Sequence, residues 1–143
     1  MDELDAQIIS LLRCNCRCPK TKTATRLSVS VSVLHKRIRA LEMKRVVIKY
    51  CALVDYQKIG YYMHVFFAIS ANKKEELLNF LISHQNVNNL FRAGGGFDLL
   101  AECIFPDIKE LHNFTEHLTR FKVCKIAEHH LIEPFKQEGF LSK

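Results

Sequence analysis

The sequence predicts an α+β fold in two parts, and three observations support this prediction. Residues 30–42 carry apolar side chains at helical spacing, and shorter helical stretches precede them. From residue 61 onwards, strand-like and helix-like apolar stretches alternate. The net charge of +6 is confined to the first part. We therefore predict an N-terminal winged helix-turn-helix unit followed by a C-terminal ferredoxin-like β-α-β-β-α-β domain.

Residues 30–42 predict an amphipathic helix. Four apolar side chains recur at spacings of three, four and three, which places them on one face: Val31, Leu34, Ile38 and Leu41. Ser30 is a suitable N-cap, because its hydroxyl accepts a bond from an unpaired N–H of the first turn. The other face carries short side chains and cations, which suit a DNA major groove. A basic helix face that contacts only solvent is the alternative at this point.

Two shorter helices are predicted upstream. The first begins after Asp2, a suitable N-cap, and Pro19 marks the break that follows it. The second spans residues 21–27. Three short helices in succession make a helix-turn-helix unit. The β-branched stretch 46–54 predicts a strand or wing that leads out of this unit.

The positive charge is concentrated near the N-terminus. Residues 1–50 contain eleven Lys or Arg against four Asp or Glu, a net charge of +7. Residues 51–143 contain ten against eleven, a net charge of −1. This distribution is expected when one module binds a polyanion and the other has a different role.

The composition is typical of a globular protein, with 48% hydrophobic and 25% charged residues. The longest apolar run, residues 65–69, is too short to cross a bilayer. The acidic N-terminus lacks the layout of a signal peptide. We therefore expect a cytoplasmic protein with no membrane partner, whose six cysteines are reduced thiols.

The second part predicts four strands and two helices. The strands are expected at residues 61–71, 86–92, 98–105 and 123–131. One helix is expected between the first and second strands, and another between the third and fourth. Both helices would cover one sheet face, so the other face is expected to be apolar and buried by a partner. The predicted domains are residues 1–50 for the helix-turn-helix, 51–60 for a connecting strand or hinge, and 61–143 for the ferredoxin-like domain.

No metal ligand set, cofactor or catalytic residue is predicted. Cys14, Cys16 and Cys18 lack the second ligand pair that structural zinc sites use. Cys103 and Cys124 fall in predicted strands and are expected to be small core residues.

Polar residues of the second part give no better candidate for a metal ligand or a catalytic residue. His129 and His130 are neighbours on a predicted strand, so their side chains point to opposite faces. Asp98 has no second acid, base or nucleophile in a recognisable motif, and we expect it to hydrogen-bond its own loop. The sequence therefore favours a protein that is not an enzyme.

Five stretches in the same order resemble the Lrp/AsnC (feast/famine) family of transcription regulators. They are Leu4-Asp5 with residues 8–12, residues 30–42, residues 46–55, Gly60-Tyr61 and residues 95–100. The resemblance covers almost the whole chain. It implies a dimer formed through the C-terminal sheet, with dimers assembling into tetramers or octamers. It also implies an amino acid or similar small effector beside the loop formed by Gly95, Gly96, Phe97 and Asp98.

The chain departs from the family at several positions. Ser28, Arg45 and Lys49 stand where the family usually has Gly. Arg45 lies where a helix normally ends in a left-handed residue, which a side chain adopts at some cost. Ile126 and Glu128 replace threonines that lie near the effector in the family. The resemblance therefore leaves two questions open: whether an effector binds at all, and whether it differs from the effectors of the family.

The predicted partner is double-stranded DNA. Major-groove contacts are expected from the start and outer face of the third helix, at Ser30, Ser32, Val33, Lys36 and Arg37. Arg39 is expected to reach a base or a phosphate. Phosphate contacts are expected from flanking cations at Lys22, Lys44, Arg45 and Lys49. One helix contacts only a few base pairs, so a useful site needs two half-sites and a homodimer.

Two other functions remain open. Sirohaem decarboxylases resemble the same two-domain architecture, although such an enzyme does not need the basic excess of residues 1–50. A non-specific, chromatin-like DNA binder would use the same cations.

Overall fold

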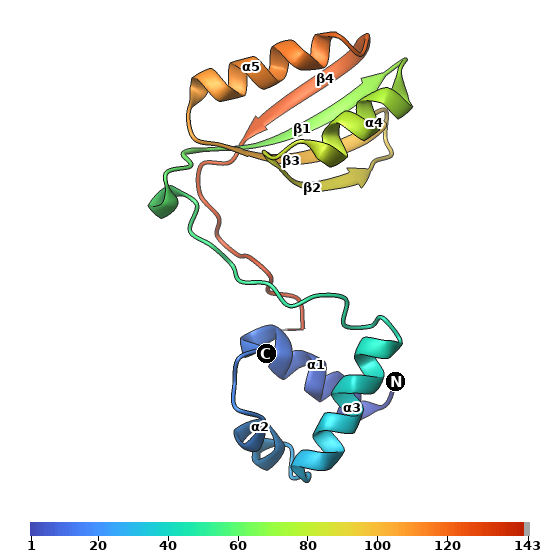
Figure 1. The fold of residues 1–143 in the computed structure, drawn as a ribbon, viewed down its shortest axis with the longest axis vertical. Helices are drawn as coiled ribbons and strands as arrows, with labels where there is room; N and C mark the ends of the chain where they lie inside the picture. Colours follow the sequence, from blue (N-terminus) through green and yellow to red (C-terminus); the bar gives the residue numbers. More distant parts are fainter. Residues whose placement is uncertain (142–143) are drawn as a thin grey trace. The chain divides into compact units, whose positions relative to one another are not determined.

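The structure is a computed structural model that describes residues 1–141. It divides into two compact units, Met1–Leu53 with the tail from Phe135, and Val54–Pro134. The elements of the first unit are α1 (Glu3–Asn15), α2 (Lys20–Arg26) and α3 (Val31–Met43) (Figure 1). Those of the second are η1 (Gln57–Ile59), β1 (Met63–Ala71), α4 (Lys74–Ser83), β2 (Val87–Arg92), β3 (Leu99–Phe105), α5 (Ile108–Thr119) and β4 (Val123–His130).

The first unit is a three-helix bundle. Its first and third helices begin where the sequence predicts, and α2 begins at Lys20, one residue before the predicted start. The Asp2 carboxylate accepts a bond from the Asp5 N–H at 2.9 Å, and the Asp5 carboxylate accepts one from the Asp2 N–H at 3.3 Å. This capping box satisfies two N–H groups at the start of α1. The core is small and consists of Ile8, Ala24, Leu34, Ile38 and Leu41.

The turn between α2 and α3 is tight and left-handed. Ser28 adopts a φ of 55°, and the Val29 N–H donates to the Ala24 carbonyl at 3.0 Å. Ser30 then caps α3, because its hydroxyl accepts a bond from the Val33 N–H at 3.2 Å. The helix-turn-helix predicted from the sequence is therefore present.

The predicted wing is absent, and the strand prediction for residues 46–54 is wrong. Residues 47–54 form no regular element. No other strand occurs in the described part of this unit, so a strand here would have no partner for its backbone. Instead, the N–H groups of Val46 and Val47 donate to the Leu41 carbonyl at the end of α3.

Two predicted core positions are also wrong. Val31 is the first residue of α3 and is 38% exposed, three residues before Leu34, the first buried residue of the helix. Cys124 is exposed on the edge strand β4, and its thiol donates to Asn72 Oδ1 at 3.2 Å. Cys103, by contrast, is buried as predicted.

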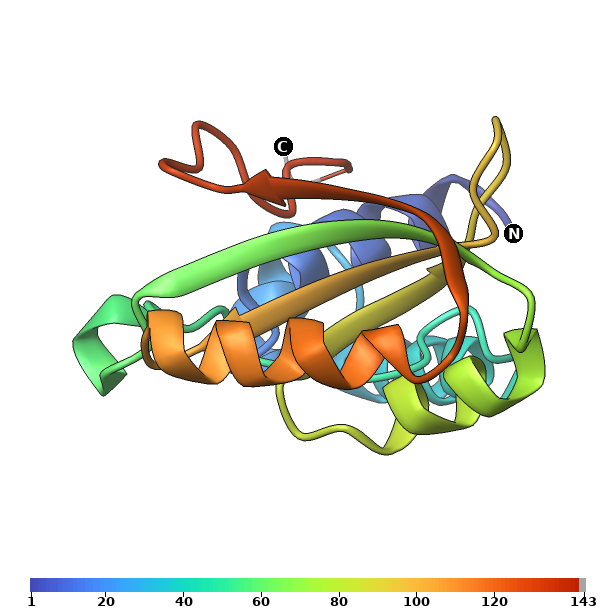
Figure 2. The same ribbon diagram turned by 90° about the horizontal axis from the view of Figure 1, so that it is seen from above.

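The second unit is a four-stranded antiparallel sheet in the order β2-β3-β1-β4, with both helices on one face (Figure 2). The β-α-β-β-α-β order is the predicted one. Alternate residues of β1 and β3 meet α4 and α5 in a core of thirteen buried residues that includes Phe67, Phe105 and Phe114. No helix among residues 1–141 is long and apolar enough to cross a membrane.

The sheet face opposite the helices is mixed, whereas the sequence predicts an apolar one. Ala68 pairs with Leu100 on one side and with Ala127 on the other, which makes a small apolar centre. Beside it, the His64 ring and the Glu102 carboxylate lie 2.6 Å apart. This face is called the open sheet face below.

Candidate nucleic-acid interface

The two sides of α3 differ in burial. Leu34, Ile38 and Leu41 lie in the helical core. Four predicted contact residues are exposed on the other side: Ser32, Val33, Lys36 and Arg39. The hydroxyls of Ser30 and Ser32 lie 3.0 Å apart, which places two short polar groups at the N-terminal end of the helix. The structure therefore gathers these residues on one accessible surface, called the α3 face below.

Arg37 differs from the other predicted contact residues. Its guanidinium forms ion pairs with the carboxylates of Asp2 and Asp5, the latter at 3.1 Å. Hydrogen bonds from the Asp5 backbone and from Arg37 lower the pKa of Asp2, and the Asp2 contact raises the pKa of Arg37. Arg37 therefore joins α3 to the start of α1.

The flanking cations come from the segments before and after α3. Lys22 is exposed on α2, and Lys44 is the C-cap of α3. Arg45 follows with a φ of 53°, the left-handed conformation expected at this position. Lys49 is exposed in the irregular segment after the bundle. All four belong to the first unit, which is an electrostatic arrangement suited to a phosphate backbone.

The predicted effector loop lies in the second unit. Gly95 and Gly96 adopt φ values of 75° and 99°, which allow the turn before β3. The Asp98 carboxylate accepts a bond from Lys74 of α4 at 2.7 Å and another from the Ser70 hydroxyl of β1. These two contacts, Lys74 first, lower the pKa of Asp98.

The same loop has a second cationic neighbour. The Lys125 ammonium of β4 lies 4.5 Å from the centre of the Phe97 ring. Sequence reasoning did not find Lys74, Ser70 or Lys125, because they come from three elements that only the sheet brings together. We expected Asp98 to hydrogen-bond its own loop, but its contacts reach further. Its N–H donates to the Ile69 carbonyl, and its carbonyl accepts from the Ala93 N–H. Its side chain joins the loop to α4 and β1.

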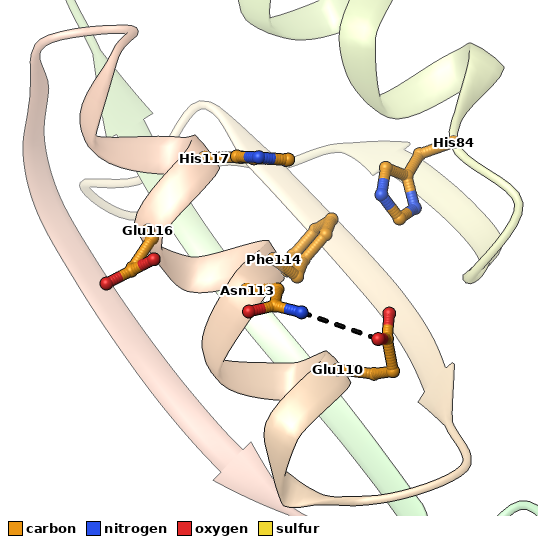
Figure 3. Close-up of a pocket in the computed structure, with 6 residues that line it drawn as sticks. All are labelled: His84, Glu110, Asn113, Phe114, Glu116 and His117. Atoms are coloured by element: carbon orange, nitrogen blue, oxygen red, sulfur yellow. Dashed lines mark hydrogen bonds between the residues drawn. The ribbon is translucent and has the colours of Figure 1, made fainter.

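A pocket of about 210 Å³ lies against α5 in the second unit (Figure 3). His84, at the end of α4, stacks edge-on against Phe114, with the ring centres 4.9 Å apart. The Asn86 N–H donates to His84 Nδ1 at 3.2 Å, which requires a neutral imidazole. Burial and the nearby His117 lower the pKa of His84. No group of three or more His, Cys, Asp or Glu among residues 1–141 is arranged to hold a metal ion.

Comparison with known proteins identifies the helical part of the chain. Residues 1–42, which contain α1, α2 and most of α3, match the AsnC-type helix-turn-helix domain. These residues therefore carry an AsnC-type helix-turn-helix domain, which agrees with the resemblance of the chain to Lrp/AsnC transcription regulators. The chain is 26% identical over 118 residues to the HTH-type transcriptional regulator FL11 of Pyrococcus horikoshii, covering 81% of this chain and 78% of that one.

Solved structures share the fold of both units. The transcriptional regulator NMB0573 of Neisseria meningitidis, solved in complex with L-Met, has a TM-score of 0.88 at 22% identity, covering 96% of this chain and 93% of that one. The leucine response regulatory protein LrpA of Mycobacterium tuberculosis has a TM-score of 0.81 at 20% identity, covering 96% and 97%. These structures confirm the α+β fold class predicted from the sequence. The AsnC-type match and the named relatives confirm the resemblance to Lrp/AsnC regulators.

Proposed function

We propose that this chain is a transcription regulator of the Lrp/AsnC type, and that it binds a specific duplex sequence as a homodimer with α3 in the major groove. One observation carries the proposal: α3 buries one side in the helical core and leaves Ser32, Lys36 and Arg39 exposed on the other. The surrounding segment, residues 1–50, has a net charge of +7. Short polar groups and cations on an accessible helix are what base edges and phosphates require.

The residues have different roles in this proposal. Ser30, Ser32, Val33 and Lys36 contact base edges, Arg39 contacts a base or a phosphate, and Lys22, Lys44, Arg45 and Lys49 contact phosphates. The ion pairs with Asp2 and Asp5 favour a positioning role for Arg37, which holds α3 at a fixed angle to α1. Arg37 therefore acts through the helix and not on a base.

The test is duplex binding by fluorescence anisotropy at several salt concentrations. The duplexes are the chain's own upstream region and a shuffled sequence of equal length. We expect the logarithm of affinity to fall linearly with the logarithm of salt, by about 0.9 per neutralised phosphate. Lys36→Ala should reduce affinity for the upstream duplex more than for the shuffled one. Lys109→Ala, which removes an exposed cation of α5, is the matched control and should change neither.

Each outcome has a distinct meaning. Salt-insensitive binding, or no binding, removes DNA as the partner. Equal affinity for both duplexes supports the non-specific, chromatin-like alternative. Equal losses on both duplexes with Lys36→Ala remove Lys36 from base recognition and leave it as a phosphate contact.

The dimer is proposed to form through the open sheet face. Its apolar centre of Ala68, Leu100 and Ala127 is small, and the His64–Glu102 pair lies beside it. An apolar centre next to a polar pair is a common composition for an interface between subunits. A second copy of the chain would also supply the second α3 that a two-half-site operator needs.

Light scattering coupled to size exclusion tests the dimer. Ala68→Asp places a charge at the centre of the open sheet face and should yield monomers. Ile82→Asp is the matched control, because Ile82 is exposed on α4, and the helices cover the opposite face of the sheet. A dimer that survives Ala68→Asp would assign the interface to another surface. The same experiment records whether tetramers or octamers form.

An amino acid or similar small effector is proposed to bind beside Gly95, Gly96, Phe97 and Asp98. The Lys74 and Lys125 ammonium groups near this loop are suited to a carboxylate. The neighbouring fold NMB0573 was solved with L-Met, which makes methionine the first ligand to try. Isothermal titration with the twenty amino acids measures this directly. Binding that is unchanged in Asp98→Asn and Lys125→Ala would move the effector elsewhere.

Catalysis is not part of this proposal. The Asp98 carboxylate is held by Lys74 and Ser70, which leaves it a structural role in the loop. We expect no change in tetrapyrrole absorbance when the protein is incubated with a sirohaem-type substrate. A spectral change that requires the protein would support the decarboxylase alternative.

A further inference from the structure

The chain passes between its two units twice. It leaves the helical unit after Leu53, and after Pro134 it returns to the helical unit with the segment that begins at Phe135. Residues 135–141 are called the tail below. The tail therefore closes a second covalent connection between the units, provided that it stays attached to the helical unit.

One arginine attaches the tail to α1. Arg13, in the last turn of α1, donates from Nε to the Phe140 carbonyl at 2.5 Å. Its Nη2 donates to the Glu138 carboxylate at 2.7 Å and to the Glu138 carbonyl at 3.3 Å. The planar guanidinium holds its donors in a fixed geometry, so three bonds to one short segment fix both its position and its direction. These three bonds are called the Arg13 latch below.

Apolar packing of the tail adds little to the latch. Phe135 is 93% exposed and Phe140 is 76% exposed, and residues 135–141 form no helix or strand. The Arg13 and Glu138 side chains are themselves 33% and 63% exposed. An ion pair with this exposure is weak and is screened by salt. The latch is therefore suited to a restraint that opens and closes.

The two connections between the units differ in length. Twenty residues lead from Met43, the end of α3, to Met63, the start of β1, and they span at most about 70 Å when extended. Only eight lead from His130, the end of β4, to Glu138, and they span at most about 28 Å. A closed latch therefore limits the separation of the units whatever their orientation, and an open latch leaves only the longer connection.

We propose that the Arg13 latch is a second tether that narrows the range of spacings between the two α3 helices of a dimer, and so selects the separation of DNA half-sites. The inference rests on the proposed DNA-binding dimer. Two linked binding modules gain affinity when their linkage matches the distance between the two sites, and they lose it when the linkage cannot span that distance. A short tether makes this dependence on distance steep, and a long one makes it shallow.

The tether is tested first without DNA, by ¹⁵N relaxation of the full chain. In the parent chain, amides of the helical and sheet units should report similar rotational correlation times. Arg13→Ala removes all three bonds, so the helical unit should tumble faster than the sheet unit. Glu138→Gln keeps the two carbonyl acceptors and should have a smaller effect. Arg17→Ala, which removes an exposed cation just after α1, is the matched control and should change nothing.

The relaxation experiment can overturn the tether in two ways. Units that already tumble independently in the parent chain would show that the latch does not restrain them. Units that still tumble together in Arg13→Ala would show that the restraint comes from elsewhere. Deleting residues 135–143 should reproduce the effect of Arg13→Ala, and a deletion without effect would exclude the tail as the tether.

The consequence for DNA is measured on two duplexes. One carries the two half-sites that footprinting of the parent chain defines, and the other has about half a helical turn, five base pairs, inserted between them. The insertion should reduce the affinity of the parent chain about tenfold and that of Arg13→Ala only about twofold. Arg17→Ala should follow the parent chain. An equal loss in the parent chain and in Arg13→Ala overturns the role of the latch in spacing.

The outcomes separate this inference from the proposed function. If the parent chain is monomeric or does not bind duplex DNA, the proposed function fails, while the relaxation experiment still tests the latch. If the parent chain binds and discriminates between the two duplexes but Arg13→Ala does so equally, the spacing role fails alone. If Arg13→Ala weakens binding to both duplexes by the same factor, Arg13 is a phosphate contact and the spacing role is again overturned.

Discussion

The two units differ in how much of their structure is held by a core. The core cluster of the helical unit has five buried residues, and that of the sheet unit has thirteen. In the helical unit, capping groups and the Arg37 ion pairs supplement the small core. The positive charge is found in this less well-packed part of the chain. A small unit that exposes cations for a polyanion has fewer apolar contacts to spare, so single changes should affect it most.

The largest expected effect comes from Leu34→Ala. Removing a fully buried side chain costs about 2–5 kcal/mol, which is a large share of the stability of a small unit. We expect the helical unit to lose hydrogen-exchange protection while the sheet unit keeps it. Leu81→Ala, at an equally buried position of the sheet unit, is the matched variant and should leave that unit folded. If Leu81→Ala unfolds the sheet unit more readily than Leu34→Ala unfolds the helical unit, the claim that the helical unit is the more sensitive one is wrong.

Arg37→Ala should have the next largest effect, on duplex binding. If Arg37 positions α3 through Asp2 and Asp5, its loss should reduce affinity for the upstream and shuffled duplexes by a similar factor. Arg37→Lys keeps the charge but loses the two-pronged contact, so it should restore only part of the affinity. Anisotropy titrations measure both. A loss confined to the upstream duplex would return Arg37 to the set of base contacts.

Arg45→Gly should move stability and affinity in opposite directions. Glycine adopts the φ of 53° without strain, so we expect the free energy of unfolding, measured by thermal melts, to rise by about 0.5–1 kcal/mol. Affinity should fall, because a proposed phosphate contact is lost. Ser28→Gly is the matched control, since Ser28 has a φ of 55° and no charge. It should raise stability without a loss of affinity, and parallel losses in both variants would contradict the phosphate role.

The smallest expected effect is the pH response of the sheet unit through His84. Its pKa is lowered in the fold by burial and by His117, so the unfolded chain binds a proton more readily. Stability should therefore be full above about pH 6.5, the ordinary value for histidine, and decrease as the pH falls below it. Thermal melts of the parent and His84→Gln between pH 7.5 and pH 5 measure this. An unchanged slope in the variant would assign the response to another group.

Much of the fold follows from local patterns in the sequence. The spacing of Leu34, Ile38 and Leu41, the caps at Asp2 and Ser30, and the apolar runs of β1 and β3 can all be recognised from residues close in the chain. The wing was predicted wrongly because β-branched residues favour a strand only when a partner strand is available. The irregular segment 47–54 has none in the described part of its unit.

The candidate site was predicted only in part. The exposed side of α3 follows from helical geometry, so Ser32, Lys36 and Arg39 could be named in advance. The ion pairs of Arg37 could not, because Asp2 lies thirty-five positions away and the pairing depends on how α1 meets α3. The surroundings of Asp98 depend in the same way on α4 and β1.

The sequence by itself determined the helix-turn-helix, the order of strands and helices along the chain and the N-terminal excess of charge, because these depend on local periodicity and composition. The tertiary structure decided which charged side chains are held inside the molecule and which are free to meet a partner. Such facts depend on the packing of helices and strands against one another, and the order of residues along the chain does not specify that packing directly.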